Sequence, residues 1–331
     1  MKNAFEIRRE LTEQETLASL FGMVEKEIKD RESSAPLLKT PESVFSQMEG
    51  NNEIRGRFAK LEFLRLNEDD LVFAITDIHG DREKQQAVLD YIKQRKTDVK
   101  GDIHLVVMGD VAGGVSVPGE DIEPLFDLLR GRKNGDFELH MLQGNVERDA
   151  PPIAGLYAKI QETEGDIRAL PAMTDLFKSL PDSLFLRDVQ GRNIMLTHSV
   201  LPLVNKKKFE EEGLEIFNRD AEEIDKLGLR KYSGVWATFD GVRKKSEYGG
   251  KKSFQLGKDT FQSILGTLGI ERILRGHDSG LIKKEAKDTG VHRVVLDEGE
   301  VDTFHTSSKA TNDFGIFVEI SGKGDLTFRK I

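Results

Sequence analysis

The sequence predicts an α/β protein with a mixed sheet system, and two observations carry this prediction. From Leu71 onward, short apolar runs typical of strands alternate with amphipathic stretches typical of helices. Near the C-terminus, strand-like runs at 292–299, 315–321 and 325–331 follow one another without a helix between them. Parallel strands need long crossovers whereas consecutive antiparallel strands do not, so we expect both kinds of pairing.

The first 65 residues are expected to form a helical extension. Thr12 and Glu15 have the spacing of a capping box, and apolar residues then recur on one helical face through residue 30. A Ser/Pro/Lys-rich stretch separates this helix from a second helical patch at 44–48. Because the segment carries no ligand-binding motif, we expect 1–65 to pack against a catalytic domain at 66–331 or to contact a partner.

Five strand-like runs each end in a polar loop, and helical patterns at 87–92, 122–129 and 259–268 lie between them. The runs 71–76, 103–108, 137–143, 193–197 and 271–275 lead into loops that carry Asp77 and His79, Asp110, Asn145, His198, and His277, respectively. Loops at the carboxyl ends of neighbouring strands converge on one crevice in α/β sheets. Each residue alone fits a turn or a structural histidine, but imidazoles and carboxylates together suit Mn, Fe or Zn. The combination predicts a metal site.

Composition and charge exclude several function classes. The 331 residues include 49 Lys and Arg against 58 Asp and Glu, a net charge of −9, which gives no support to a nucleic-acid or membrane-surface binder. The absence of cysteine excludes disulfides, thiolate zinc sites and a cysteine nucleophile. No apolar stretch is long enough to span a membrane, and no cleavable secretory signal is visible. We expect a cytoplasmic-type protein, although an uncleaved export signal would leave the same pattern.

The order and the residues of these loops resemble those of the calcineurin-like metallophosphoesterases, in particular of phosphoprotein phosphatases of the PPP type. The matching blocks are TDIHGD at 76–81, GDVAGG at 109–114, GNVE at 144–147, THSVLP at 197–202, GVWATFD at 234–240 and RGH at 275–277. The resemblance covers about 250 residues, from Val72 to Ser321. It implies a two-sheet mixed β-sandwich flanked by helices, preceded here by the helical extension.

The resemblance also implies two divalent metal ions, with manganese as the first choice and iron or zinc as alternatives. Asp77, His79 and Asp110 would hold one ion, and Asp110, Asn145, His198 and His277 the other, so that Asp110 is the bridge. Two cations about 3.5–4 Å apart can lower the pKa of a bridging water and clamp a phosphoryl oxygen. A metal-bridging hydroxide would then be the nucleophile, which explains why no cysteine is needed.

The sequence departs from the family pattern around this centre. The family would place Asp and Arg where Gly113 and Gly114 stand, and a proton-donating histidine where Val146 stands. Replacements for the phosphate contact are Arg148, Arg243, Lys251, Lys252 and Arg275, and replacements for the proton donor are Asp149, Asp278 and His305. Each of these residues is also compatible with an ordinary surface position. We therefore expect Asp110, Asn145, Asp149 and His305 as the catalytic set.

Three functions fit this pattern. The first is a metal-dependent phosphoprotein phosphatase that acts on phosphorylated proteins or peptides and favours phosphotyrosine and other aryl phosphates, because Val146 cannot protonate a leaving group. The second is a nucleotide or dinucleotide polyphosphate hydrolase. The third is a catalytically weak pseudo-phosphatase that binds a phosphorylated partner. Retained ligands favour the first two, and the missing arginine and histidine favour the third.

Overall fold

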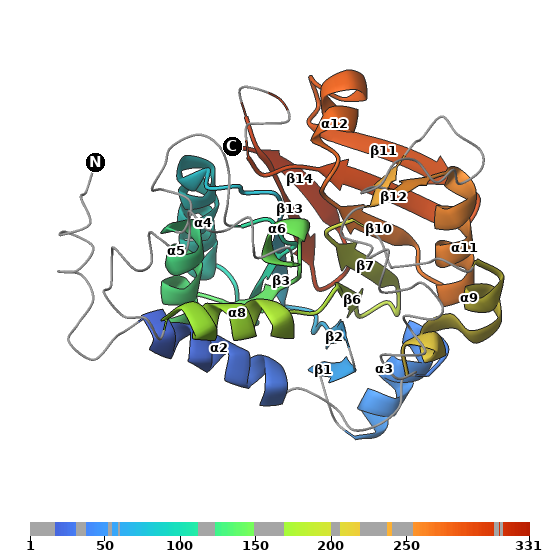
Figure 1. Cartoon of the computed structure of the whole chain (residues 1–331), viewed down its shortest axis with the longest axis horizontal. Helices are drawn as coiled ribbons and strands as arrows, with labels where there is room; N and C mark the ends of the chain where they lie inside the picture. Colours follow the sequence, from blue (N-terminus) through green and yellow to red (C-terminus); the bar gives the residue numbers. More distant parts are fainter. Residues whose placement is uncertain are drawn as a thin grey trace.

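The structure, a computed structural model, describes residues 17–30, 38–51, 55–58, 60–111, 123–148, 169–199, 206–218, 237–239, 254–307, 311 and 314–331. Two sheets packed face to face form its centre (Figure 1). The predicted α/β fold with two mixed sheets flanked by helices is confirmed. In the part of the chain that the structure describes, no helix is both long and apolar enough to cross a bilayer.

The smaller of these two sheets carries the first three predicted strand-to-loop units. Its strand order is β14 (Leu326–Lys330), β13 (Ile316–Ser321), β3 (Leu71–Ile75), β4 (Ile103–Val107) and β5 (Glu138–Met141). Strands β3, β4 and β5 are parallel, and β13 runs antiparallel to β3. All residues of β3 and β4 are buried, as expected for strands covered on both faces.

The larger sheet has seven strands and is also mixed. Their order is β1 (Arg55–Phe58), β2 (Leu61–Arg65), β6 (Ser183–Arg187), β7 (Asn193–Thr197), β10 (Arg272–Arg275), β12 (Gly299–Phe304) and β11 (Val291–Leu296). Strands β7 and β10 are parallel, so their carboxyl ends lie at one edge. A small parallel pair, β8 (Ala237–Phe239) and β9 (Phe254–Leu256), stands apart from both sheets.

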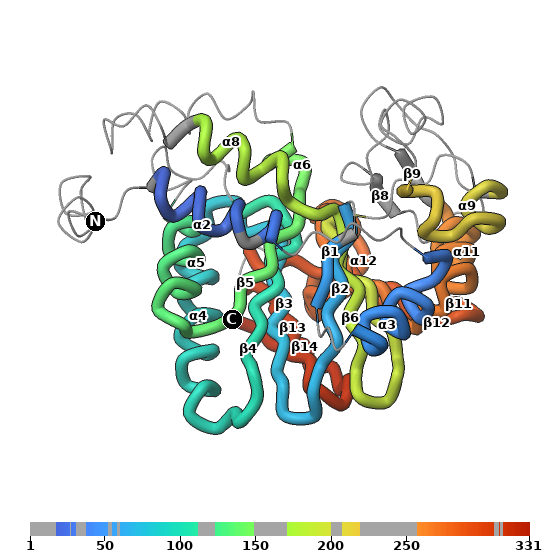
Figure 2. The backbone as a smooth tube through the Cα atoms, turned by 90° about the horizontal axis from the view of Figure 1, so that it is seen from below, coloured from blue at the N-terminus to red at the C-terminus, as the bar shows by residue number. Residues whose placement is uncertain are grey.

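Helices cover the outer face of each sheet, which gives four layers (Figure 2). On the five-stranded sheet lie α2 (Leu17–Asp30), α4 (Arg82–Lys96), α5 (Glu123–Lys133) and α8 (Ala169–Ser179). On the seven-stranded sheet lie α3 (Pro41–Gly50), α9 (Lys206–Glu212), the 3-10 helix η2 (Gly213–Asn218) and α11 (Lys258–Leu268). Two short helices, α6 (Asn145–Arg148) and α12 (Ser279–Glu285), begin at or just after predicted ligands.

Alternating side chains divide the core into layers. In β3, Phe73 and Ile75 pack among the helices, whereas Val72 and Ala74 pack between the sheets against residues such as Leu184. Side chains at successive positions of a strand point to opposite faces of the sheet. One short strand therefore contributes side chains both to the layer under the helices and to the layer between the sheets. The sandwich thereby holds the strand ends in fixed positions.

The N-terminal region differs from the expected helical extension. Arg55–Phe58 and Leu61–Arg65 form β1 and β2, and β2 pairs in parallel with β6. The two preceding helices supply fully buried side chains, including Phe21 in one apolar layer and Phe45 in another. These helices and strands belong to the sheet and its cores, while residues 1–16, 31–37, 52–54 and 59 of the expected extension lie outside the described residues.

Candidate metal centre

The loops that leave β3, β4, β5, β7 and β10 meet at the carboxyl ends of their strands, as the sequence predicts. Backbone hydrogen bonds tie them together: the His79 amide donates to the carbonyl of Asp110 at 2.9 Å, and the Gly276 amide donates to the carbonyl of His198 at 3.0 Å. These bonds fix the distance between side chains that lie far apart in the sequence. The six predicted ligands are consequently neighbours.

Backbone strain is concentrated at this site. Among the non-glycine residues that the structure describes, positive φ angles occur at Asp77 (50°), His79 (50°), Asp110 (54°) and His277 (69°), all of them predicted ligands. Such left-handed conformations cost about 1–3 kcal/mol each and persist where the surroundings hold them. Strain of this kind clusters at functional sites because it aims side chains in directions that regular structure does not allow.

Asp77, His79 and Asp110 form the first group of candidate ligands. Nε2 of His79 lies 3.5 Å from Oδ1 of Asp77 and 3.5 Å from Oδ2 of Asp110. The three ligand atoms all lie within 4.8 Å of one another. Two carboxylates and one imidazole around a common point are a donor set that suits a divalent metal.

Asp110, His198 and His277 form the second group. Nε2 of His198 lies 3.6 Å from Oδ2 of Asp110 and 3.1 Å from Nδ1 of His277. The same Nε2 lies 3.0 Å from Oδ1 of Asn145, so the amide side chain completes the cluster. Asp110 belongs to both groups, and its Oδ2 faces a histidine of each.

The hydrogen bond behind the His198 ring orients this side chain as a metal ligand of the second group. Nδ1 of His198 lies 2.9 Å from the carbonyl of Met108, which can only accept, so Nδ1 carries the proton. Nε2 of the neutral ring then presents a lone pair to the oxygens of Asp110 and Asn145. A metal ion between this nitrogen lone pair and these oxygens would satisfy all of them at once. A backbone carbonyl that accepts from the other ring nitrogen is the usual support of a metal-binding histidine.

Burial and mutual charge shape the ionisation of the cluster. Burial raises the pKa of Asp110, and the nearby Asp77 raises it further. For Asp77 burial acts in the same direction, but His305, His198 and His79 outweigh it and hold its pKa well below the usual range. Burial lowers the pKa of His277 well below its usual value, and a proton on the neighbouring His198 would lower it further, which favours the neutral, ligand form of the His277 ring.

Glu147 supports the centre in a role that sequence reasoning missed. Its buried carboxylate accepts hydrogen bonds from the amides of Asp110 (2.8 Å), Val111 (2.9 Å) and Gly144 (2.9 Å). It thereby joins the loop after β4 to the loop after β5 and holds the strained Asp110. Burial, with Asp110 close by, raises the pKa of Glu147. The GNVE block contains this residue, but the block gave no sign of which amides it binds.

Arg275, Asp278 and His305 are three further candidate site residues that the structure describes. Arg275 is fully buried, donates from Nε to the carbonyl of Ser199 at 2.8 Å and pairs with Asp278 at 2.7 Å. This buried pair gives no support to a substrate contact by Arg275 or to proton delivery by Asp278. His305 lies beside the cluster, with Nε2 3.8 Å from Oδ2 of Asp77, and burial lowers its pKa to about 4.

The remaining candidates flank the centre or fall outside the described part of the chain. Arg148 is partly exposed and ends α6, the helix that begins at Asn145. Asp149, Arg243, Lys251 and Lys252 lie outside the described residues, as do Gly113 and Gly114.

The donor set therefore fits a dinuclear centre, in which Asp77, His79 and Asp110 would hold one ion and Asp110, Asn145, His198 and His277 the other. When bound, such ions supply an acidified water as nucleophile and stabilise charge on a phosphoryl group. The protein's part is to orient the ligands. Thr76 donates from Oγ1 to Oδ2 of Asp77 at 2.7 Å, and the Val146 amide donates to Oδ1 of Asp110 at 2.9 Å.

Comparisons with known proteins bear on the fold and on the family. A protein serine/threonine phosphatase from Saccharomyces cerevisiae with similarity to human phosphatase PP5 matches with a TM-score of 0.60 and 14% identity, over 95% of this chain and 88% of that chain. At this identity the likeness shows the shared fold alone. A cold-active protein-tyrosine phosphatase of a psychrophilic Shewanella species matches with a TM-score of 0.47 and 15% identity, over 80% and 83% of the two chains. No curated protein matches the sequence.

The family model of the calcineurin-like phosphoesterases matches residues 71–279, which is more than half of the chain and contains all six candidate ligands. The chain belongs to the calcineurin-like phosphoesterase family, whose members are phosphoesterases with a dinuclear metal centre.

Proposed function

We propose that this chain is a phosphoprotein phosphatase of the PPP type that hydrolyses phosphate monoesters with two divalent metal ions, manganese being the first candidate and iron or zinc the alternatives. The observation that carries the proposal is the shared position of Asp110 between two groups of metal-ligand side chains. A phosphorylated protein or peptide is the proposed substrate, by resemblance of the loop motifs to the PPP-type phosphatases.

Val146 leads us to propose a preference for aryl phosphates such as phosphotyrosine. Its amide is engaged with Asp110, and its side chain packs against the apolar layer under the helices, so this position offers no acidic proton. The phenol of tyrosine has a pKa of about 10 and leaves with little help, whereas a serine alkoxide gains strongly from a proton donor. Without a proton donor at position 146, hydrolysis of the alkyl ester should be slowed more than hydrolysis of the aryl ester.

Two residues remain proposed replacements for the proton donor, and four for the phosphate contact. His305 stands beside Asp77 at the edge of the cluster, where a pKa of about 4 would leave its ring neutral near pH 7 and make it the weaker candidate. Asp149 follows α6 directly in sequence. Arg148 is the described candidate for the phosphate contact, because it ends the helix that begins at Asn145. Arg243, Lys251 and Lys252 are proposed from the sequence alone.

The first experiment measures hydrolysis of an aryl phosphate with Mn²⁺, with and without chelator, in the full-length protein and in Asp110→Asn. We expect activity that needs the metal and falls strongly in the variant, because Asp110 would serve both ions. Binding of a phosphopeptide without any metal-dependent turnover would instead support a phospho-partner-binding protein, the function that Val146 and Gly114 favour.

The second experiment compares matched phosphotyrosine, phosphoserine and phosphothreonine peptides by kcat/KM, which reports transition-state discrimination. We expect the phosphotyrosine peptide to be the best substrate. Val146→His should raise kcat/KM for phosphoserine more than for phosphotyrosine, up to the factor of roughly 10²–10⁴ that general acids contribute. Val189→His, at an exposed position, is the matched control. Equal turnover of the three peptides by the wild type would refute the leaving-group argument.

A further inference from the structure

A second group of metal-ligand side chains lies at the opposite ends of the strands that lead to the catalytic loops. Asp70 directly precedes β3, Asp102 directly precedes β4, and His104 is the second residue of β4. The ligand atoms of these three residues lie within 4.8 Å of one another. They are separated from Asp77 and Asp110 by the length of the buried strands, so they form a distinct cluster.

A chain of buried polar groups stands behind His104. Nδ1 of His104 lies 3.2 Å from Nε2 of His140 on β5, and Nδ1 of His140 lies 2.8 Å from Oε1 of Glu62 on β2. All three side chains are buried, and the chain crosses from one sheet to the other through the sandwich. Buried imidazoles joined to a carboxylate in this way are the usual outer support of a metal-binding histidine.

The same chain could support an ion bound at His104. With an ion on Nε2 of His104, Nδ1 of that ring would carry the proton and donate to Nε2 of His140. Nδ1 of His140 would in turn donate to the carboxylate of Glu62. Nε2 of His104 is the ring nitrogen on the side away from His140. His104 shares its cluster with two carboxylates, an arrangement that a cation stabilises.

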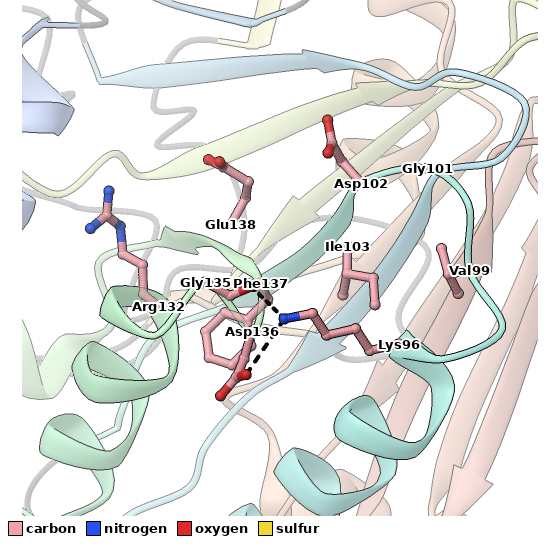
Figure 3. A pocket seen from close by; sticks show the side chains of 10 residues that line it. All are labelled: Lys96, Val99, Gly101, Asp102, Ile103, Arg132, Gly135, Asp136, Phe137 and Glu138. Atoms are coloured by element: carbon pink, nitrogen blue, oxygen red, sulfur yellow. Dashed lines mark hydrogen bonds and ion pairs between the residues drawn. The ribbon is translucent and has the colours of Figure 1, made fainter.

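The two carboxylates are held in place and reach solvent. Asp70 is buried, and its Oδ1 and Oδ2 accept from the amides of Asp102 (2.9 Å) and Asn67 (2.7 Å), respectively. Asp102 is exposed and lines a pocket of about 300 Å³ at the ends of β4 and β5. Figure 3 shows Asp102 and Glu138 projecting away from the helical side of this pocket. An ion would therefore reach the cluster through the exposed side chain of Asp102 and not through the pocket, whose lining contains neither Asp70 nor His104.

We propose that Asp70, Asp102 and His104 bind a Zn²⁺ ion, with Nε2 of His104 as the nitrogen ligand and Glu62 and His140 as its outer support. One imidazole and two carboxylates are donors that zinc accepts, and water would complete its coordination. The ion would link the loop before β3 to the start of β4, at the end of the sheet opposite the catalytic loops. Its role is structural, and it is independent of hydrolysis at the dinuclear centre.

The test counts Zn²⁺ bound per chain in the full-length protein, after dialysis against Zn²⁺ alone, for the wild type, Asp102→Asn and Asp98→Asn. Asp102→Asn removes an exposed ligand and leaves the buried chain intact, and Asp98→Asn removes an exposed carboxylate outside the cluster. We expect Asp102→Asn to bind one Zn²⁺ fewer than both other proteins. The same difference should appear in the Asp110→Asn background, which separates this site from the catalytic one.

A direct view of the ion comes from anomalous diffraction at the zinc edge, from crystals soaked in Zn²⁺. The proposal predicts a peak between Asp70, Asp102 and His104 that disappears in Asp102→Asn. Equal zinc counts in the three proteins, or the absence of this peak in the wild type, would overturn the proposal, whatever the outcome of the phosphatase assays.

Discussion

Replacement of Glu147 by glutamine should destabilise the fold by about 2–4 kcal/mol, because its carboxylate accepts three buried amides. Glutamine has one acceptor oxygen. If that oxygen keeps the amides of Asp110 and Gly144, the Val111 amide loses its acceptor, which costs about 1–3 kcal/mol. The two remaining bonds lose charge assistance, at roughly 1 kcal/mol each. Removing a buried charge whose pKa is raised by burial offsets part of this sum.

Urea unfolding of the metal-free protein, followed by circular dichroism, measures this loss. The control is Glu83→Gln, whose side chain is 87% exposed and whose replacement should change stability by no more than about 0.5 kcal/mol. Because Glu147 also holds the strained Asp110, Mn²⁺ affinity should fall in the same variant. A Glu147→Gln protein with the stability and the Mn²⁺ affinity of the wild type would refute the assigned role.

Three further predictions address the ligands and the N-terminal region. Gly276→Ala should weaken Mn²⁺ binding, because a Cβ there would lie 2.0 Å from Oδ2 of Asp77; Gly280→Ala, where an added Cβ meets nothing within 4 Å, should bind as the wild type does. Asn145→Ala should weaken mainly one of two Mn²⁺ ions in a binding titration, whereas loss of both would contradict its placement in one group only. Phe45→Ala should cost about 3–5 kcal/mol in urea unfolding, because the fully buried ring packs edge-on against Phe63 at 5.6 Å; a loss below about 1 kcal/mol would show that α3 is a loose extension.

The sequence was sufficient to locate the loops that carry the candidate metal ligands, because the pattern that marks each loop is local in the sequence. An apolar run followed by a polar loop marks the ends of β3 and β4, and parallel strands bring such ends together. The strands β1 and β2 were not predicted from the sequence. Arg55–Phe58 contains two arginines and a glycine, and its place in the sheet depends on the pairing of β2 with the distant β6. Long-range pairing of this kind leaves no local pattern.

Burial of charged side chains was the other feature that the sequence could not show. Arg275 sits beside a predicted ligand and was a reasonable phosphate contact, but its ion pair with Asp278 turns it into a buried structural group. Glu147 stands two residues from Asn145, and only the fold shows that its carboxylate reaches across to the loop after β4. Residue type and spacing predict which groups are near the site, and packing decides what each contacts.

The central claim is that one carboxylate, that of Asp110, is shared by two metal ions, and electron paramagnetic resonance of the Mn²⁺-loaded protein tests it most directly. Two Mn²⁺ ions bridged by one carboxylate are magnetically coupled, whereas isolated ions give the spectrum of single Mn²⁺ centres. We predict a coupled signal in the wild type that is lost in Asp110→Asn and kept in the exposed control Glu83→Gln. A wild-type protein saturated with Mn²⁺ that shows only uncoupled signals would contradict the account.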